Sequence, residues 1–318
     1  MKISALGALL FLICAAPAQS ASSQIPGATK TSARTMSQSI LPKAVVNPGI
    51  REVALAAPWP PADVDKMMPS VASTPACSLP EVLAGAGSRI QELLHNVDRF
   101  TATEVVHHQN VDASGHLRKP ETSRFYYLVS MSQRPNGSVL TDEYRQGLTK
   151  KDQFPDQIIT QGTPGLVLIF HPQYVSNFAM TCEGLGEWHG QPAWQVRFEQ
   201  RRDTPQFMVS IVSGSRSFGL RLRGRAWILA DSYQVARLET DLEDQVPALR
   251  LRLQHQNTEY GPVTFNQGQT QIWLPSSTEL FLDFRGYRFY RKHTFTDFGL
   301  FSVKVNQEFG DLLETANQ

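Results

Sequence analysis

The sequence has no excess of either charge. Its 318 residues include 30 basic and 29 acidic ones, which give a formal net charge of +1 at pH 7. Proteins that bind a nucleic acid backbone carry clustered basic residues, because cations must neutralise the phosphates. The two signs are mixed along this chain, so we expect no nucleic acid partner.

Long apolar runs are missing beyond the first twenty residues, and a transmembrane helix needs ~20 apolar residues in succession. The start of the chain is different. Met1-Lys2 supplies a positive charge, Ile3 to Ala16 is almost wholly apolar, and Ala18-Gln19-Ser20 offers small residues where a signal peptidase cleaves. We expect residues 1–20 to be a signal peptide that is cleaved before Ala21. The mature chain is then periplasmic or secreted, without a transmembrane span.

Cysteine is scarce, with three in the whole chain. Cys14 lies within the expected signal peptide, and its neighbour Ile13 is too large for a lipoprotein cleavage site. Cys77 and Cys182 remain, and an even pair in an oxidising compartment indicates one disulfide. Two independent buried thiols are the alternative.

Familiar catalytic and metal-binding motifs are absent. The eight histidines show no H-x-x-x-H or H-E-x-x-H spacing, and His107 and His108 are neighbours in a predicted strand, which sends their side chains to opposite faces. The serine-rich stretch 213–217 lacks the G-x-S-x-G pattern of a nucleophile elbow. We therefore expect no catalytic residue, no metal site and no cofactor, and we interpret the chain as a protein that is not an enzyme.

One charged stretch needs an explanation. Glu239, Asp241, Glu243 and Asp244 follow one another closely, and strands predicted to face them carry Arg221, Arg223, Arg250 and Arg252. Cross-strand ion pairs on a solvated sheet face explain both sets. A site for an anion or a lipid headgroup is the alternative.

Residues 21–76 are rich in Ala, Ser, Thr and Pro and show no lasting period, which predicts a disordered linker. Within it, Asp63 to Met68 is the one stretch suited to a short helical turn. A single folded domain is expected over residues 77–310, with a C-terminal tail at 311–318.

The domain begins with an amphipathic helix. Ser78 and Glu81 match an S-x-x-E capping box. Gly85 and Gly87 weaken the helix or allow it to lie close to a partner. Apolar residues then recur every three or four positions, at Leu79, Val82, Leu83, Ala86, Ile90, Leu93, Leu94 and Val97.

After Phe100 the apolar period changes to two, which is typical of strands with one buried face. Short turns at Asn136-Gly137, His189-Gly190 and Asp231-Ser232 join successive strands, so an antiparallel meander of nine to eleven strands is expected. A helical insert is expected over Pro155–Pro172. The fold class is therefore α+β, mainly antiparallel β.

An apolar face emerges from these strands. If it lines one side of the sheet, it is either plain core or the wall of a binding site. One helix cannot cover so wide a sheet, so the sheet must curl on itself or leave an apolar cavity. The residues of this face are Phe125, Tyr127, Trp194, Phe198, Trp227, Leu251, Trp273, Leu282 and Phe284.

The pattern of one helix followed by a long meander resembles the LolA/LolB-like periplasmic lipoprotein carriers. The most similar stretch is residues 224–239, where a strand bearing Trp227, a short polar turn and a return strand follow one another. The resemblance spans residues 79–305 and extends to an uncharacterised group of exported bacterial proteins. It implies one large curved sheet, a half-barrel, with the N-terminal helix and the helical insert packed on it.

Two functions follow as expectations. The first is an exported binding protein whose apolar cavity takes a lipid, a lipoprotein acyl chain or another hydrophobic ligand. The second is a structural or interaction protein of the cell envelope, with a filled β core and an envelope protein as its partner.

Overall fold

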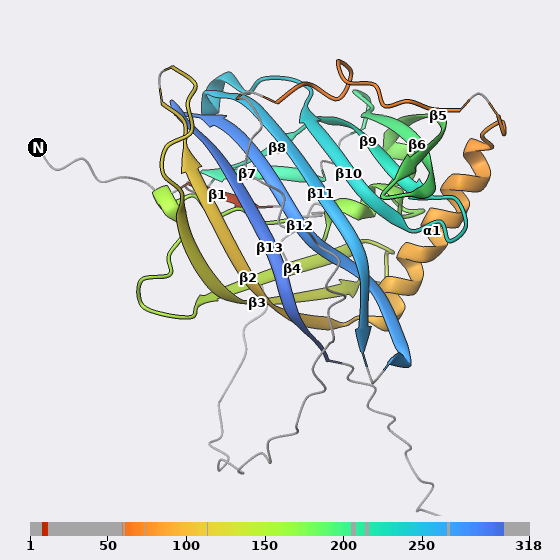
Figure 1. The fold of residues 1–318 in the computed structure, drawn as a ribbon, viewed down its shortest axis with the longest axis horizontal. Coiled ribbons are helices and arrows are strands. Elements are labelled where there is room, and N and C mark those ends of the chain that lie inside the picture. Colours follow the sequence, from red (N-terminus) through yellow and green to blue (C-terminus); the bar gives the residue numbers. More distant parts are fainter. Residues whose placement is uncertain are drawn as a thin grey trace, which may run out of the picture.

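The computed structural model describes residues 8–11, 59, 61–72, 74–112, 114–204, 208–213, 216–265 and 268–301 (Figure 1). In chain order the helices and strands are β1 (Ala8–Phe11), α1 (Leu79–Asn96), β2 (Arg99–Asn110), β3 (Glu121–Gln133), β4 (Val139–Gly147), β5 (Phe178–Trp188), β6 (Gln191–Gln200), β7 (Val209–Ser213), β8 (Arg216–Leu220), β9 (Leu222–Leu229), β10 (Val235–Leu242), β11 (Leu251–Phe265), β12 (Thr270–Phe284) and β13 (Tyr287–Phe301). Within the described residues, four short 3-10 helices accompany them: η1 (Pro155–Gln157), η2 (Leu166–Phe170), η3 (Val175–Asn177) and η4 (Pro247–Leu249).

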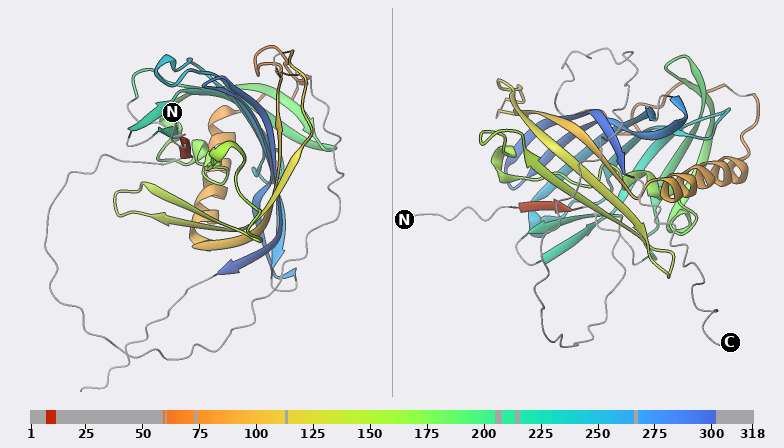
Figure 2. Two further views of the ribbon diagram at one scale, coloured as in Figure 1. Left: turned by 90° about the vertical axis from the view of Figure 1, so that its left-hand side faces the viewer. Right: turned by 90° about the horizontal axis from the view of Figure 1, so that it is seen from below.

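Ten strands form one antiparallel sheet in the order β4-β3-β2-β13-β12-β11-β10-β9-β6-β5. The sheet curves around α1, which lies inside the curve (Figure 2). We call the face toward α1 the inner face and the opposite one the outer face. The expected fold class, an open and mainly antiparallel sheet with a long N-terminal helix, is confirmed.

The chain does not run through the sheet as one meander. β2 pairs with β13, with Phe100 opposite Leu300, so the first and last strands of the domain are neighbours. Strands that follow one another in the chain are neighbours in the sheet within three separate runs: β2 to β4, β5 to β6 and β9 to β13. β7 and β8 leave the main sheet and form a small second sheet with β1, whose Ala8–Phe11 belong to the expected signal peptide.

Helix α1 matches its predicted bounds but not its predicted cap. Ser78 is the N-cap residue, yet its side chain makes no capping hydrogen bond. Glu81 instead accepts a hydrogen bond from the Tyr233 hydroxyl at 3.0 Å. The capping box is therefore wrong, because the carboxylate that would complete it is bound to a residue distant in sequence.

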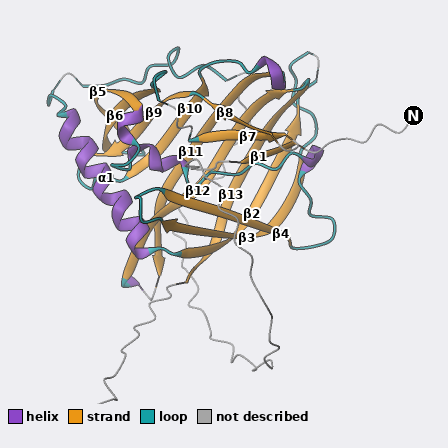
Figure 3. Ribbon diagram, turned by 180° about the vertical axis from the view of Figure 1, so that it is seen from behind, coloured by secondary structure: helices purple, strands orange, loops and turns teal. Residues whose placement is uncertain are grey.

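The two glycines of α1 do allow close packing. A Cβ atom on Gly85 would lie 2.4 Å from the Tyr233 ring, and one on Gly87 would lie 3.3 Å from the Phe170 carbonyl oxygen. The helix thus rests on the turn between β9 and β10 and on η2. Figure 3 shows α1 on the inner side of the sheet, with short helical turns beside it. The expected helical insert consists of single 3-10 turns, and every residue of η2 is buried.

In the part of the chain that the structure describes, three hydrophobic clusters form the core. The first fills the inner face between α1, η2 and the strands from β6 to β13, and it includes Ile90, Phe170 and Leu282. The second surrounds Phe100 and Tyr127 where β2, β3 and β13 meet. The third is small and lies on the outer face, with Ala193, Trp227, Leu229 and Ala236 as its buried members.

Cys77 and Cys182 form the expected disulfide, with their Cα atoms 6.2 Å apart and 105 residues between them in sequence. The Cα separation is within the usual range for a disulfide. The bond joins the residue before the N-cap of α1 to β5, the last strand of the sheet. It therefore ties the helix to the sheet edge.

The expected disordered linker is wrong for residues 61–72, which we call the N-terminal strap. The Val64 side chain is fully buried, and its amide donates to Asp241 Oδ2 at 2.8 Å. Farther along, Ala72 pairs with Leu185 on β5. Composition predicted disorder because the strap has little apolar surface of its own. In the structure the strap is held by ion pairs and backbone hydrogen bonds to side chains of the sheet.

Candidate functional site

The nine residues of the predicted apolar face do not share one surface. Six are buried on the inner side: Phe125, Tyr127, Phe198, Leu251, Leu282 and Phe284. Phe198, Leu251, Leu282 and Phe284 belong to the first cluster and Tyr127 to the second, while Phe125 stacks on Phe154 with ring centroids 4.8 Å apart. Trp194 is half-buried and packs against the first cluster. These side chains are packed core in the structure.

The placement of Trp227 on the inner face is wrong. Ala226 and Ile228 belong to the first cluster, so Trp227 between them points to the outer face, where it joins the third cluster. The Arg237 guanidinium lies 5.0 Å from its ring centroid. Because β9 is buried on both faces, hydrophobicity did not distinguish the inner face from the outer one.

A pocket of about 80 Å³ lies between α1 and β12. It opens where the first and second clusters meet, since Ile90 and Val167 come from the first, and Met131 and Ile272 from the second. Its other apolar walls are Leu93, Trp273 and Leu274, while exposed or half-buried Arg89, Glu92, Asn96, Gln234 and Gln271 line its solvent side.

Of the nine predicted residues only Trp273 lines this pocket. Sequence reasoning missed Ile90, Leu93 and Met131 as candidates, although the helical stripe of α1 already marked Ile90 and Leu93 as facing the sheet. The pocket is small. A cavity of about 150 Å³ is what binds one benzene molecule, so the inner face as it stands is largely filled.

A polar cluster lies on the inner face beyond the apolar core. Arg145 on β4 makes ion pairs with Glu104 on β2, Nε to Oε2 at 2.5 Å, and with Glu143, Nη2 to Oε2 at 3.1 Å. Glu143 also accepts from the Tyr127 hydroxyl at 2.7 Å, and His293 Nδ1 lies 2.7 Å from Glu104 Oε1. The sequence prediction did not include this cluster. The alternation of side chains along β2 could have indicated it, because it puts Glu104 on the same face as Phe100 and Ala102.

Burial and neighbouring charges shift the pKa values of the ionisable groups in and near this cluster. Burial alone would raise the pKa of Glu104, but Arg145 and His293 overcome it and lower the pKa to about 2. Burial raises the pKa of Glu143 in spite of Arg145. Burial also lowers the pKa of Arg291 to about 9. The side chains of Glu104, Glu143 and Arg145 are almost wholly enclosed, so the cluster has no room for a substrate and fastens the strands together.

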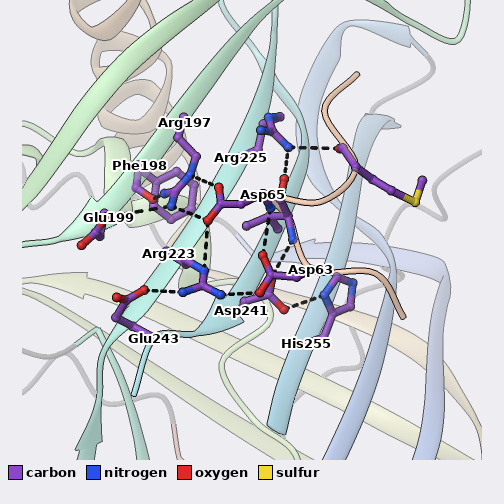
Figure 4. A network of polar contacts seen from close by, with 12 residues as sticks. Asp63, Asp65, Arg197, Phe198, Glu199, Arg223, Arg225, Asp241, Glu243 and His255 are labelled. Carbon is purple, nitrogen blue, oxygen red and sulfur yellow. Dashed lines mark hydrogen bonds and ion pairs between the residues drawn. The ribbon is translucent and has the colours of Figure 1, made fainter. Parts of the chain in front are cut away.

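On the outer face, charged side chains hold the N-terminal strap (Figure 4). Arg223 forms ion pairs with Glu243 at 2.9 Å and with Asp63 of the strap, and Arg197 pairs with Asp65 at 2.7 Å. The expectation of a solvated charged face is therefore wrong for the central part of β9 and β10. The strap covers it, and sequence alone did not show that the acidic strap and the basic strands meet.

No family model and no curated protein matches the sequence. Solved structures with a similar fold include a LolA superfamily protein from Nitrosomonas europaea, at 9% identity over 72% of this chain and 96% of that chain, with a TM-score of 0.36. A DUF1329 family protein from Desulfovibrio piger is similar at 9% identity over 71% and 94%, with a TM-score of 0.39.

The Mycobacterium tuberculosis lipoprotein LppX is similar at 10% identity over 72% of this chain and 100% of that chain, with a TM-score of 0.28. These likenesses concern the fold alone, and they agree with the resemblance found in the sequence. Among the described residues, no helix is both long and apolar enough to cross a bilayer.

Proposed function

We propose that this chain is an exported, non-enzymatic binding protein that holds an apolar chain between α1 and the inner face of the sheet. The ligand class is a lipid, a lipoprotein acyl chain or another long hydrophobic molecule, met in the periplasm or outside the cell. The observation that supports the proposal is the pocket at the junction of the two inner clusters, where α1 and β12 leave apolar walls unfilled.

In this proposal the pocket is the point of entry rather than the full site. A long chain extends from it only if α1 moves away from β12 and leaves Ile90 and Leu93 to contact the ligand. Burying methylenes yields ~0.8 kcal/mol each, so a chain of about fourteen carbons gains ~10 kcal/mol, which offsets the helix contacts that are lost. The disulfide at Cys77 keeps the N-terminal end of α1 attached during this movement.

The second candidate is a structural or interaction protein of the envelope. The observation that favours it is the filled inner face, in which η2 occupies the space that a ligand would otherwise take. The two candidates differ in one respect: a structural protein has no reason to open between α1 and β12.

Displacement of a fluorescent fatty acid tests the proposal. Leu93 and Leu83 are both half-buried on α1, but Leu93 lines the pocket and Leu83 packs only against the first cluster. We expect Leu93→Gln to weaken binding about tenfold or more, since an amide then faces the ligand without a partner. Leu83→Gln should weaken it far less. Absence of binding by the wild-type chain, or equal loss in both variants, would favour the structural candidate.

A further inference from the structure

The strap is held on the outer face by contacts to both backbone groups of one residue. The Val64 amide donates to Asp241 Oδ2 at 2.8 Å, and its carbonyl oxygen accepts from Arg225 Nη1 at 2.5 Å. The Val64 side chain is fully buried between them. A surface that pairs with the main chain and buries one side chain has the two features by which proteins recognise extended peptides.

The two residues that flank Val64 in the sequence form ion pairs with arginines of the sheet. Asp63 pairs with Arg223, and Asp65 pairs with Arg197 at 2.7 Å and with Arg223 at 3.3 Å. The surface therefore fits a segment in which carboxylates flank an aliphatic residue. Figure 4 shows these arginines on neighbouring strands beneath the strap.

The receiving residues are held in place by partners outside the strap. Arg225 is buried and makes two hydrogen bonds to Glu183 on β5, at 2.5 and 2.9 Å. Asp241 Oδ1 lies 2.9 Å from His255 Nδ1. Because these pairs do not depend on the strap, the surface stays formed when the strap leaves.

The strap makes fewer buried contacts than the residues that receive it. Among the described residues of the strap, only Val64 has a fully buried side chain, and Met67 and Met68 are 70% and 68% exposed. The Asp65 side chain is 46% exposed, and ion pairs of such groups contribute little to stability. Segments with few buried contacts open locally without unfolding the domain.

We propose that the outer face of β6, β9 and β10 is a binding site for an acidic–aliphatic–acidic segment of a partner protein, and that the strap occupies this site in cis until it is displaced. A second copy of this chain is the weaker occupant. Its strap has the same intrinsic affinity, but the tethered strap has an effective concentration on the order of mM. A partner protein meets the same competition, but its segment can bind more tightly than the strap and displace it, which an identical strap cannot do.

The experiment uses the full chain with its own strap weakened by Asp63→Lys and Asp65→Lys, which leaves Val64 unchanged. A fluorescently labelled peptide with the sequence of residues 61–72 is the probe, and anisotropy is the readout. We expect the peptide to bind the double variant at least tenfold more tightly than the wild-type chain, in which the site is filled. Val64→Asp in the chain should have the same effect, and the same change in the peptide should abolish binding.

A matched pair of charge reversals locates the site. Added to the Val64→Asp chain, whose strap keeps Asp63 and Asp65, Arg223→Glu should remove peptide binding, whereas Arg216→Glu on the exposed part of β8 should not. Failure of the peptide to bind any strap-weakened variant, or equal binding to the wild-type chain, would overturn the proposal. Dimerisation of the wild-type chain at micromolar concentration would overturn the choice of a partner protein over a second copy.

Discussion

The guanidinium of Arg145 makes two hydrogen bonds to the carboxylate of Glu104 inside the curved sheet, Nε to Oε2 at 2.5 Å and Nη2 to Oε1 at 3.1 Å. Glu104 lies on β2 and Arg145 on β4, with β3 between them. Both side chains are nearly or fully enclosed. The pair therefore joins β2 to β4 across β3.

Glu104→Gln should destabilise the chain by about 3–5 kcal/mol at pH 7, because it leaves the Arg145 charge buried without its main partner. Urea denaturation measures this. Glu121→Gln, at an exposed position of β3, is the control and should change the free energy of unfolding by less than about 0.5 kcal/mol. A Glu104→Gln chain as stable as the control would show that the pair does not fasten the sheet.

The same variant should remove part of the acid sensitivity. The folded pKa of Glu104, about 2, is below its ordinary value of 4.5, so the folded state binds this proton less tightly than the unfolded state. Its stabilisation is complete above pH 4.5 and is lost as the pH falls through 2. The stability difference between wild type and Glu104→Gln should shrink over this range. A constant difference would contradict the assigned pKa direction.

Removing the disulfide should lower the free energy of unfolding. For a loop of about 100 residues, the chain-entropy model gives about 4.7 kcal/mol. We expect Cys77→Ala with Cys182→Ala to approach this loss, and reductant to lower the unfolding midpoint of the wild type but not of the double variant. An unchanged midpoint in reductant would show that the bond does not hold α1 to β5.

The glycines of α1 should differ in their tolerance of a methyl group. Gly85→Ala gains ~1 kcal/mol of helix propensity but overpacks against the Tyr233 ring, which costs ~1–3 kcal/mol. Gly87→Ala meets its nearest neighbour at 3.3 Å and should keep most of the gain. Thermal unfolding should rank Gly87→Ala above Gly85→Ala, and the reverse order would mean that α1 is not fixed by this contact.

Local patterns predicted the elements well. The stripe from Leu79 to Val97 predicted α1, and Asn136-Gly137 predicted the hairpin of β3 and β4, because both depend on neighbours in sequence. The pairing of β2 with β13 joins residues about 200 positions apart in the sequence, such as Phe100 and Leu300, which no local pattern reports. The small sheet of β7 and β8 was missed for the same reason.

The candidate site was harder to predict. Trp273 was selected because it is aromatic in an alternating strand, and it does line the pocket. Trp227 was selected on the same grounds and faces outward, since β9 is covered on its outer side by the third cluster and by the strap. A two-residue period gives the two faces of a strand but not which one is inner. That choice depends on packing partners distant in the sequence.

The most direct test of the proposed function is quenching of tryptophan fluorescence by a brominated fatty acid. Quenching requires the bromines to lie close to the ring, and Trp273 borders the pocket while Trp227 lies on the outer face. The comparison is between the wild-type chain, Trp273→Phe and Trp227→Phe. We predict strong quenching in the wild type and in Trp227→Phe, and a marked loss of quenching in Trp273→Phe. Equal quenching in all three, or none in the wild type, would contradict binding between α1 and the sheet.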